Sequence, residues 1–383
     1  MKYATRRLSY AATIAISALS ATVVHADDED RGKQLDRYAV TNLVSDIQGI
    51  ASNADTVLQN SWGVAFSPAA SPFWVADNAT GCSTLYDGAG AKVNLQVKIP
   101  LPGGSIPASA CKHVDPAHPP SQSPAAPTGM VWNASSAFQI PGTSPPITAS
   151  FIFATEDGTL SAWAGGLTPP DAAVLAADNS ASGAVYKGLV FGTNPSGVFL
   201  FATNFRGGTV DVFDHTYHLV TTDGGFKDPA IPAGFAPFGI QNLDGNLFVT
   251  YAKQNAAKHD DVAGQGNGFV DVFDTEGHLL RRLAARGQLN SPWGVARASY
   301  AFGRFNGDVL IGNFGDGKIN AFDSDGDFRG TLKGPDNKPI VIDGLWTLAL
   351  GGGRNSSSDT LYFTAGPNGE TDGLFGTITP VSK

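Results

Sequence analysis

Short apolar strands and glycine turns alternate along almost the whole chain. Six times, a glycine opens a short strand, a second strand follows that is apolar along its length, and a third strand alternates between apolar and polar positions. Continuous apolar runs are typical of strands covered on both faces, and alternation is typical of half-buried strands. The opening glycines are Gly63, Gly129, Gly188, Gly239, Gly294 and Gly344.

These glycines recur at intervals of 50 to 66 residues, a length that accommodates four strands and their turns. Helical periodicity is almost absent, and 46 Gly and 24 Pro interrupt the chain. A parallel β-helix needs a much shorter period, and a β-sandwich does not repeat one motif six times. The pattern therefore predicts an all-β fold, a six-bladed β-propeller with four-stranded antiparallel blades.

One strand-like segment has no blade of its own. Residues 38–44 read Tyr-Ala-Val-Thr-Asn-Leu-Val and precede the first repeat. Because closure of the ring removes exposed strand edges, we expect this N-terminal strand to form the outer strand of the last blade. The expected domain is a single propeller over residues 38–383.

The first 26 residues have the composition of a secretory signal peptide. Lys2, Arg6 and Arg7 precede an apolar run that ends in a small-residue cleavage motif at Ala26. We expect cleavage there, a flexible acidic segment over residues 27–37, and a periplasmic or secreted protein. After signal cleavage no stretch is long and apolar enough to be a transmembrane segment.

Charge narrows the range of partners. The formal net charge is −9, and signal cleavage would remove three of the 25 basic residues and none of the 34 acidic ones. So acidic a protein is poorly suited to nucleic acid or to an anionic lipid surface. The expected partner is a small molecule, a glycan or an extracellular protein.

The two cysteines, Cys82 and Cys111, lie in or beside an irregular stretch rich in Pro and Ser, residues 100–127. An even number of cysteines in an exported protein favours a disulfide. Such a bridge would stabilise the fold by about 3 kcal/mol on the loop-entropy estimate. Two buried free thiols are the alternative.

The strand motifs resemble those of a known group of propellers. Openings such as Pro292-Trp293-Gly294-Val295 and endings such as Val212-Phe213-Asp214 resemble NHL-type propellers. The segments 41–46, 73–78, 202–206, 249–253, 312–317 and 363–367 are similar to an uncharacterised family of exported bacterial six-bladed propellers, over residues 38–379. Some relatives carry a PEP-CTERM tail, which is absent here. The resemblance implies a fold and a compartment but no known activity.

Propellers usually bind ligands at the mouth of the central channel. The residues just before the first five opening glycines are expected at that mouth, with Trp346 nearby. The aromatic ones would suit a sugar ring, an aromatic compound or an apolar peptide. Packing between blades is the alternative role. The candidate ligand rim is Trp62, Thr128, Lys187, Phe238, Trp293 and Trp346.

Polar residues follow the second strands of several repeats. Their carboxylate and amide oxygens are the ligands that Ca²⁺ prefers. Six-bladed calcium-dependent lactonases and phosphotriesterases use such a set, and the chain resembles them loosely. Strand-end capping and Asx turns are the alternative role. The candidate metal ligands are Asp77, Asn78, Glu156, Asp157, Asn204 and Asn313.

One loop, residues 253–268, departs from the repeat between a second and a third strand. It carries His259, Asp260 and Asp261, the best local cluster for acid–base chemistry or for a divalent ion. A solvated polar loop is the alternative.

Other chemistries lack their motifs. No histidine recurs at equivalent inner-strand positions, which disfavours zinc–histidine and haem propellers. No GxSxG is present, so a serine hydrolase is unsupported. The stretch from Asp323 begins like a calcium loop, but Gly334 stands where the twelfth-position Glu is needed, so a turn is expected.

Three functions remain open from the sequence. The first is a scaffold that binds a ligand or partner at the channel mouth. The second is a calcium-dependent hydrolase of a lactone, ester or phosphoester, in which the metal would polarise the reacting oxygen. The third is a component of a polysaccharide or cell-surface matrix. Whether the protein is an enzyme is left open, and Ca²⁺ is the only cofactor suggested.

Overall fold

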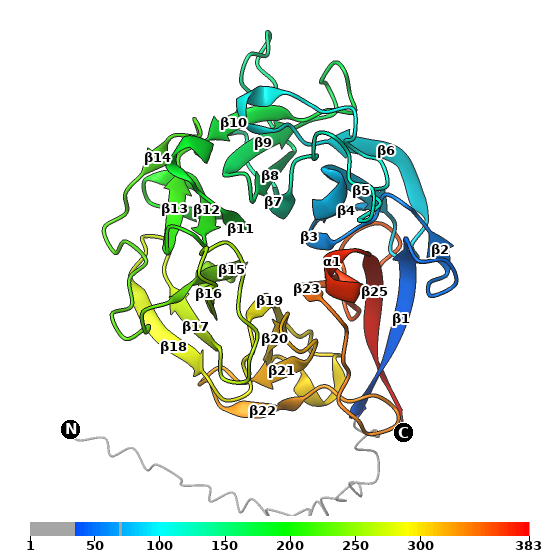
Figure 1. Ribbon diagram of the computed structural model, residues 1–383. Helices are drawn as coiled ribbons and strands as arrows, with labels where there is room; N and C mark the ends of the chain where they lie inside the picture. The colour runs from blue at the N-terminus through cyan, green and yellow to red at the C-terminus, as the bar shows by residue number, and fades with distance from the viewer. Residues whose placement is uncertain (1–34, 69–70, 383) are drawn as a thin grey trace, which may run out of the picture. The chain divides into compact units, whose positions relative to one another are not determined.

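Six β-sheets surround a central channel in the computed structural model of the protein, which describes residues 35–68 and 71–382 (Figure 1). Each sheet has four antiparallel strands, and the sixth carries an additional short strand. The innermost strand of each sheet packs beside the innermost strands of its two neighbours. The expected six-bladed β-propeller is confirmed.

The blades follow the chain in order. Blade 1 contains β3 (Ser61–Ala65), β4 (Phe73–Asp77), β5 (Cys82–Tyr86) and β6 (Lys92–Lys98). Blade 2 contains β7 (Pro127–Trp132), β8 (Phe151–Thr155), β9 (Thr159–Trp163) and β10 (Val174–Asp178). Blade 3 contains β11 (Tyr186–Asn194), β12 (Gly197–Asn204), β13 (Thr209–Phe213) and β14 (Leu219–Val220).

The second half of the ring repeats this order. Blade 4 contains β15 (Phe235–Leu243), β16 (Asn246–Lys253), β17 (Gly268–Phe273) and β18 (Leu279–Ala285). Blade 5 contains β19 (Pro292–Arg297), β20 (Val309–Asn313), β21 (Ile319–Phe322) and β22 (Phe328–Thr331). Blade 6 contains β23 (Leu345–Leu350), β24 (Leu361–Ala365), β25 (Leu374–Val381) and β1 (Arg37–Ser45), with β2 (Asn53–Ala54) added in parallel to β1.

Helical structure in the described residues is limited to single turns. These are η2 (Asn78–Thr80), η3 (Pro102–Gly104), η4 (Ser180–Ser182), η5 (Gly303–Phe305) and α1 (Pro367–Glu370). None of the helices in this part of the chain is long and apolar enough to cross a membrane. The signal peptide expected over residues 1–26 lies outside the described residues.

The ring is closed as the sequence predicts. Strand β1 pairs antiparallel with β25, the last strand of the chain. The buried Tyr38 side chain of β1 stacks on Phe302 and Phe305 of the neighbouring blade 5, with ring centroids 5.0 and 6.0 Å away. Its hydroxyl donates a hydrogen bond of 3.1 Å to the Phe302 carbonyl oxygen. The N-terminal strand therefore completes blade 6 and also holds it to blade 5.

Every inner strand has a register shift at the same place, and this explains the repeated glycine. At this bulge adjacent inner strands approach each other closely. A Cβ atom on Gly63 would lie 2.3 Å from the Thr128 carbonyl oxygen, and one on Gly239 would lie 2.2 Å from the Trp293 carbonyl oxygen. Glycine is needed here because the neighbouring backbone occupies the space of a side chain.

Blade 6 departs from the expected pattern. The pairing of Leu348 with Phe363 corresponds to that of Val295 with Ile311 in blade 5, so Thr347 and not Gly344 occupies the glycine position. Gly344 precedes β23 and has a left-handed backbone, with φ 65°. Assigning Gly344 to the repeat is therefore wrong, because this glycine serves a turn and the inner strand begins after it.

The disulfide between Cys82 and Cys111 is present, as expected. It ties the first residue of β5 to the long connection between β6 and β7, which contains no strand and only the turn η3. The Gln59 side chain also holds this connection, because its Oε1 accepts the Val114 N–H at 2.7 Å. The connection between β6 and β7, which we call the insertion, is thereby anchored next to the start of the inner strand of blade 1.

Candidate functional site

The predicted rim residues form one ring at the end of the channel where the inner strands begin, which we call the entry mouth. They occupy equivalent positions in all six blades, directly before the glycine of the repeat and, in blade 6, directly before Thr347. All of them are buried, from Thr128 at 0% to Trp293 at 9% exposure. The aromatic members therefore pack inside the channel and do not stand open at its surface.

These aromatic side chains close the channel. Trp346 lies between two stacked rings, with its centroid 3.5 Å from that of Trp62 and 3.9 Å from that of Phe314. Trp293 meets both Trp62 and Trp346 edge to face. We call the set Trp62, Phe205, Phe238, Trp293, Phe314 and Trp346 the aromatic layer.

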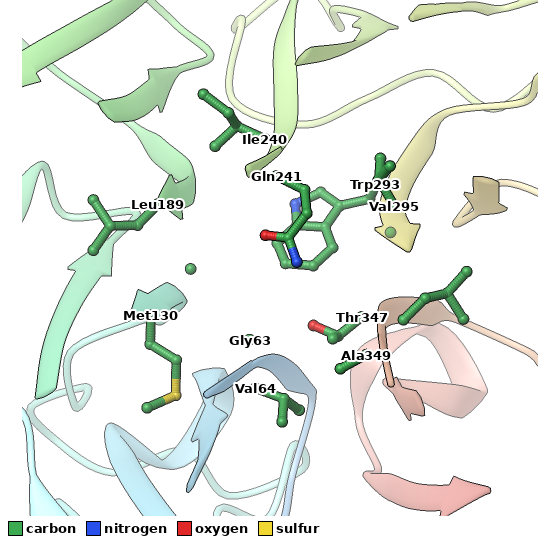
Figure 2. A pocket seen from close by; sticks show the side chains of 13 residues that line it. Gly63, Val64, Met130, Leu189, Ile240, Gln241, Trp293, Val295, Thr347 and Ala349 are labelled. Carbon is green, nitrogen blue, oxygen red and sulfur yellow. The ribbon is translucent and has the colours of Figure 1, made fainter. Parts of the chain in front are cut away.

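A small chamber of about 50 Å³ lies on the other side of the aromatic layer. Figure 2 shows Trp293 and Gln241 extending into this chamber, whereas the side chains of Leu189 and Ile240 point away from it. Because Trp293 also belongs to the aromatic layer, the layer separates the chamber from the entry mouth. The entry mouth is thus a blind site.

A second ring of residues lies at the same mouth, where the second strand of each blade ends. Each member follows by three positions the second-strand residue that pairs with the inner strand just past its glycine position, as Asn78 follows Val75. The members differ strongly in size and polarity. They are Asn78, Glu156, Phe205, Ala252, Phe314 and Gly366. Phe205 and Phe314 complete the aromatic layer. Asn78 and Glu156 begin the polar half of the entry mouth, where they are hydrogen bonded to each other.

Blades 4 and 6 have small residues in this second ring, Ala252 and Gly366. The two longest loops between second and third strands follow directly, residues 254–267 and 366–373. A Cβ atom on Gly366 would lie 2.3 Å from the Asn60 Oδ1 atom. Small residues here leave room for groups that the loops and the chain before β3 bring to the mouth.

Lys187 and Glu156 form a buried ion pair at the centre of the polar half. The Lys187 side chain is 3% exposed and that of Glu156 is 13% exposed. The Asn78 amide donates to the other Glu156 oxygen at 2.9 Å. The Lys187 ammonium also lies over the Trp62 ring, 5.0 Å from its centroid, and over that of Phe205 at 5.9 Å. Carboxylate and aromatic faces together stabilise a positive charge at this point.

Asn60 joins the two rings to the loop of blade 6. Its Nδ2 donates to Asn78 Oδ1 at 3.2 Å and to Glu370 Oε2 at 2.9 Å, while its Oδ1 accepts the Trp346 indole N–H at 3.1 Å. The Asn60 amide is therefore fully engaged between the aromatic layer and the acidic groups above it.

Glu370 is held in an unusual backbone and electrostatic state. Asn368, Gly369 and Glu370 have positive φ values of 58°, 69° and 70°, so α1 is a left-handed turn. Such a conformation costs about 1 kcal/mol for a residue with a side chain. Burial, together with the nearby Glu156 carboxylate, raises the pKa of Glu370 to about 7. Strained backbone and a displaced pKa together are typical of functional positions.

The loop of blade 4 brings further ionisable groups to the same place. Asp260 accepts a hydrogen bond from His259 Nδ1 at 2.7 Å, and its Oδ1 lies 3.7 Å from the Lys187 ammonium. Burial raises the pKa of the neighbouring Asp261. The candidate loop cluster and the candidate rim residue Lys187 are therefore parts of one site.

Glu156, His259 and Asp260 could hold a metal ion, because one ligand atom of each lies within 4.8 Å of the others. The Lys187 ammonium already binds Glu156, however, and it also lies near Asp260. A resident cation would compete with this ammonium for the same oxygens and would be repelled by it. Among the described residues this group brings three ligand atoms together, fewer than the six to eight oxygen ligands that Ca²⁺ takes.

Of the six candidate metal ligands, only Asn78 and Glu156 are hydrogen bonded to each other at the mouth. Asp157 lies beside Glu156 and accepts the Ala126 N–H at 2.9 Å, and burial raises its pKa. Asp77 is fully buried within blade 1, where its Oδ2 accepts the Thr84 N–H at 3.0 Å and burial raises its pKa well above the usual range.

The remaining two candidates serve their own blades. The Asn204 amide donates to Asp211 at 2.9 Å, and the Asn313 amide donates to the Gln288 carbonyl oxygen at 2.8 Å. The structure therefore does not bring the six residues together as one ligand set.

Sequence reasoning missed Asn60 and Glu370. Asn60 directly precedes the first inner strand, and Glu370 follows the second strand of blade 6 by five residues. A weak signal was present for Glu370, because the loops after second strands already supplied Glu156 and Asp260. Asn60 was missed because it precedes the strand, and an Asn-Ser pair also precedes the inner strand of blade 5, as Asn290-Ser291.

The fold and this site define a class: a six-bladed β-propeller with a blind polar site at one mouth of its channel. The streptogramin B lyase structure has the same fold, with a TM-score of 0.50 and 12% identity over 89% of this chain and 97% of that one. No protein-family model matches the chain.

Two curated proteins of Acanthamoeba polyphaga mimivirus are much more similar in sequence. The uncharacterised proteins R648 and L690 are each 30% identical over 350 residues, 89% of this chain and 80% and 85% of their own lengths. The chain belongs to the family of these viral proteins. These relatives are viral, so they give no support to the finer expectation of an exported bacterial family.

Proposed function

We propose that the protein is a binding propeller that takes a small polar ligand at the entry mouth. One observation carries the proposal: a network of hydrogen bonds and ion pairs joins residues from blades 1, 2 and 3 and from the loops of blades 4 and 6 over a closed aromatic layer. Ordinary strand-end capping needs only partners within one blade, as Asn204 and Asn313 have. A network that crosses five blades at a blind mouth fits ligand recognition better.

A thermal-shift screen with a library of small polar metabolites tests this function. Each compound that raises the melting temperature of the native protein is measured again on Glu156→Gln, which keeps the shape of the side chain and removes its charge. We expect hits whose effect falls at least several-fold in this variant. Hits that act equally on both proteins, or a screen without hits, would contradict a ligand site at this mouth.

A calcium-dependent hydrolase is the second candidate, and the grouping of Glu156, His259 and Asp260 is the observation that favours it. Calcium would have to displace the Lys187 ammonium from Glu156. The test is a melt with and without millimolar CaCl₂, on the native protein and on Asp260→Asn. A calcium-induced rise that disappears in Asp260→Asn supports a metal site, and no rise counts against it.

We further propose that the protein works outside the cytosol, as a periplasmic or secreted protein whose first 26 residues are removed. The Cys82–Cys111 disulfide supports this, because such bonds persist in oxidising compartments. N-terminal sequencing of the protein recovered from medium and from cell fractions tests it. Recovery only from the cytosol with an intact N-terminus would contradict export.

A further inference from the structure

The balance of charge at the entry mouth is strongly one-sided. Five carboxyl groups lie at this mouth, on loops and strands of blades 2, 4 and 6. They are Glu156, Asp157, Asp260, Asp261 and Glu370. Four of them interact with the Lys187 ammonium, and Asp157 lies beside Glu156. The basic groups in the contacts just described are the Lys187 ammonium and the His259 imidazole, which is hydrogen bonded to Asp260. The mouth is therefore built to meet a positive charge.

The hydrogen-bond inventory points the same way. Asn60 uses both of its amide N–H groups, in bonds to Asn78 and Glu370, and Asn78 uses one, in its bond to Glu156. The groups left at the mouth are mainly carboxylate oxygens, which accept hydrogen bonds. A ligand with hydrogen-bond donors therefore complements these oxygens.

A second, independent observation concerns the kind of cation. The protein itself places an alkyl ammonium here, because Lys187 Nζ lies over the Trp62 and Phe205 rings while it binds Glu156. Aromatic faces stabilise organic cations with a partly apolar surface. Calcium has no such apolar surface, and it would have to displace the Lys187 ammonium from the same carboxylate oxygens.

We propose that the ligand of the entry mouth is a small organic amine, recognised as a cation by Glu156, Asp260 and Glu370 above the aromatic layer. This inference rests on the proposed binding function and specifies its ligand class. The pKa of Glu370, which burial and the nearby Glu156 carboxylate raise to about 7, fits it, because a cation that enters beside this carboxyl group favours its ionised form. Binding then releases protons, so affinity should increase from pH 6 to pH 8.

Calorimetric titration with 1,4-diaminobutane tests the proposal, with 1,4-butanediol as the neutral isostere. We expect the diamine to bind, the diol not to bind measurably, and the affinity to be several-fold higher at pH 8 than at pH 6. Asp260→Asn should weaken diamine binding about fivefold to tenfold, because one charge-assisted hydrogen bond is lost. Asp325→Asn, an exposed aspartate in the turn between β21 and β22, is the matched control and should bind as the native protein does.

The outcomes separate this inference from the proposed function. If metabolite hits sensitive to Glu156→Gln are neutral or anionic, the binding function stands and the amine class is wrong. Equal binding of the diamine and the diol, or an unchanged affinity in Asp260→Asn, would overturn the amine class as well. If neither the library nor the diamine binds, both proposals fail.

Discussion

The Thr347 hydroxyl donates a hydrogen bond of 2.6 Å to the Trp62 carbonyl oxygen and so joins the inner strands of blades 6 and 1. In the other five blades a glycine stands at this position. The same Trp62 carbonyl also accepts the Thr364 hydroxyl. Two hydroxyl groups therefore bond one carbonyl at this junction, whereas at the junction of blades 3 and 4 the Phe238 carbonyl accepts one hydroxyl, that of Thr203, at 2.7 Å.

Thr347→Val should destabilise the ring moderately. Valine keeps the shape of threonine but loses the hydroxyl donor, and a buried hydrogen bond contributes about 1 kcal/mol. The Trp62 carbonyl keeps its bond from Thr364, which limits the loss. Urea unfolding should show a midpoint lowered by a corresponding amount, and an unchanged midpoint would show that this hydroxyl does not stabilise the closure.

Gly239→Ala should be far more harmful than its size suggests. The new Cβ would lie 2.2 Å from the Trp293 carbonyl oxygen and 3.0 Å from the Thr250 hydroxyl. Because backbone must move to relieve this contact, we expect a loss of about 3 kcal/mol in the free energy of unfolding. Gly165→Ala is the control, since its Cβ would meet only Trp163 at 4.0 Å. Similar stability of the two variants would contradict the close packing of inner strands.

Glu370→Gln should change how stability depends on pH. The pKa of Glu370 is about 7 in the folded protein, whereas the unfolded chain releases this proton near the usual glutamate value of 4.5. The stabilising contribution of this group is thus present below pH 4.5 and is lost as the pH rises through 7. Glutamine stays neutral, so its advantage over the native protein should grow between pH 5 and 8.

Melting temperatures of the native protein and Glu370→Gln at several pH values measure this difference directly. Asp325→Asn serves again as the control. A difference that is constant across pH would mean that Glu370 titrates as an exposed carboxyl does.

Loss of the disulfide should affect both stability and the entry mouth. Cys82→Ser combined with Cys111→Ser removes a constraint worth about 3 kcal/mol on the loop-entropy estimate. The Gln59 side chain links the insertion to the mouth, because its Nε2 donates to the Val114 and Thr371 carbonyl oxygens at 3.1 Å each. The segment that carries Glu370 should therefore become more mobile.

Hydrogen exchange of residues 366–373, compared between the native protein and the double serine variant, measures this effect. Faster exchange in that segment together with a lower melting temperature is expected. A lower melting temperature with unchanged exchange there would confine the role of the disulfide to global stability.

The fold could be predicted because each blade repeats one local pattern. The second strands are apolar along their length and the third strands alternate. Each pattern indicates whether one or both faces of the strand are buried, and it can be recognised within the strand itself. The position of Thr347 could not be predicted in the same way. Its assignment depends on the register between β23 and β24, and Gly344 offered an equally plausible glycine three residues earlier.

The site could be predicted only in pieces. Lys187, Glu156 and Asp260 belonged to three separate candidate sets, and the ring geometry is what brings them together. Adjacent residues were not distinguished: Asp77 lies inside blade 1, whereas Asn78 begins the turn and reaches the mouth. Glu370 depends on a left-handed turn whose conformation is fixed by distant partners such as Asn60.

The closure of the ring by β1 also determines the place on the propeller at which a partner fused to either end is attached. Arg37 pairs directly with Val381, so the two ends of the propeller lie together at the outer edge of blade 6 (Figure 1). A surface or fusion partner attached at either end would hold the propeller by this edge, away from the channel axis. Immobilised protein should therefore keep its entry mouth open to solution, whichever end carries the link.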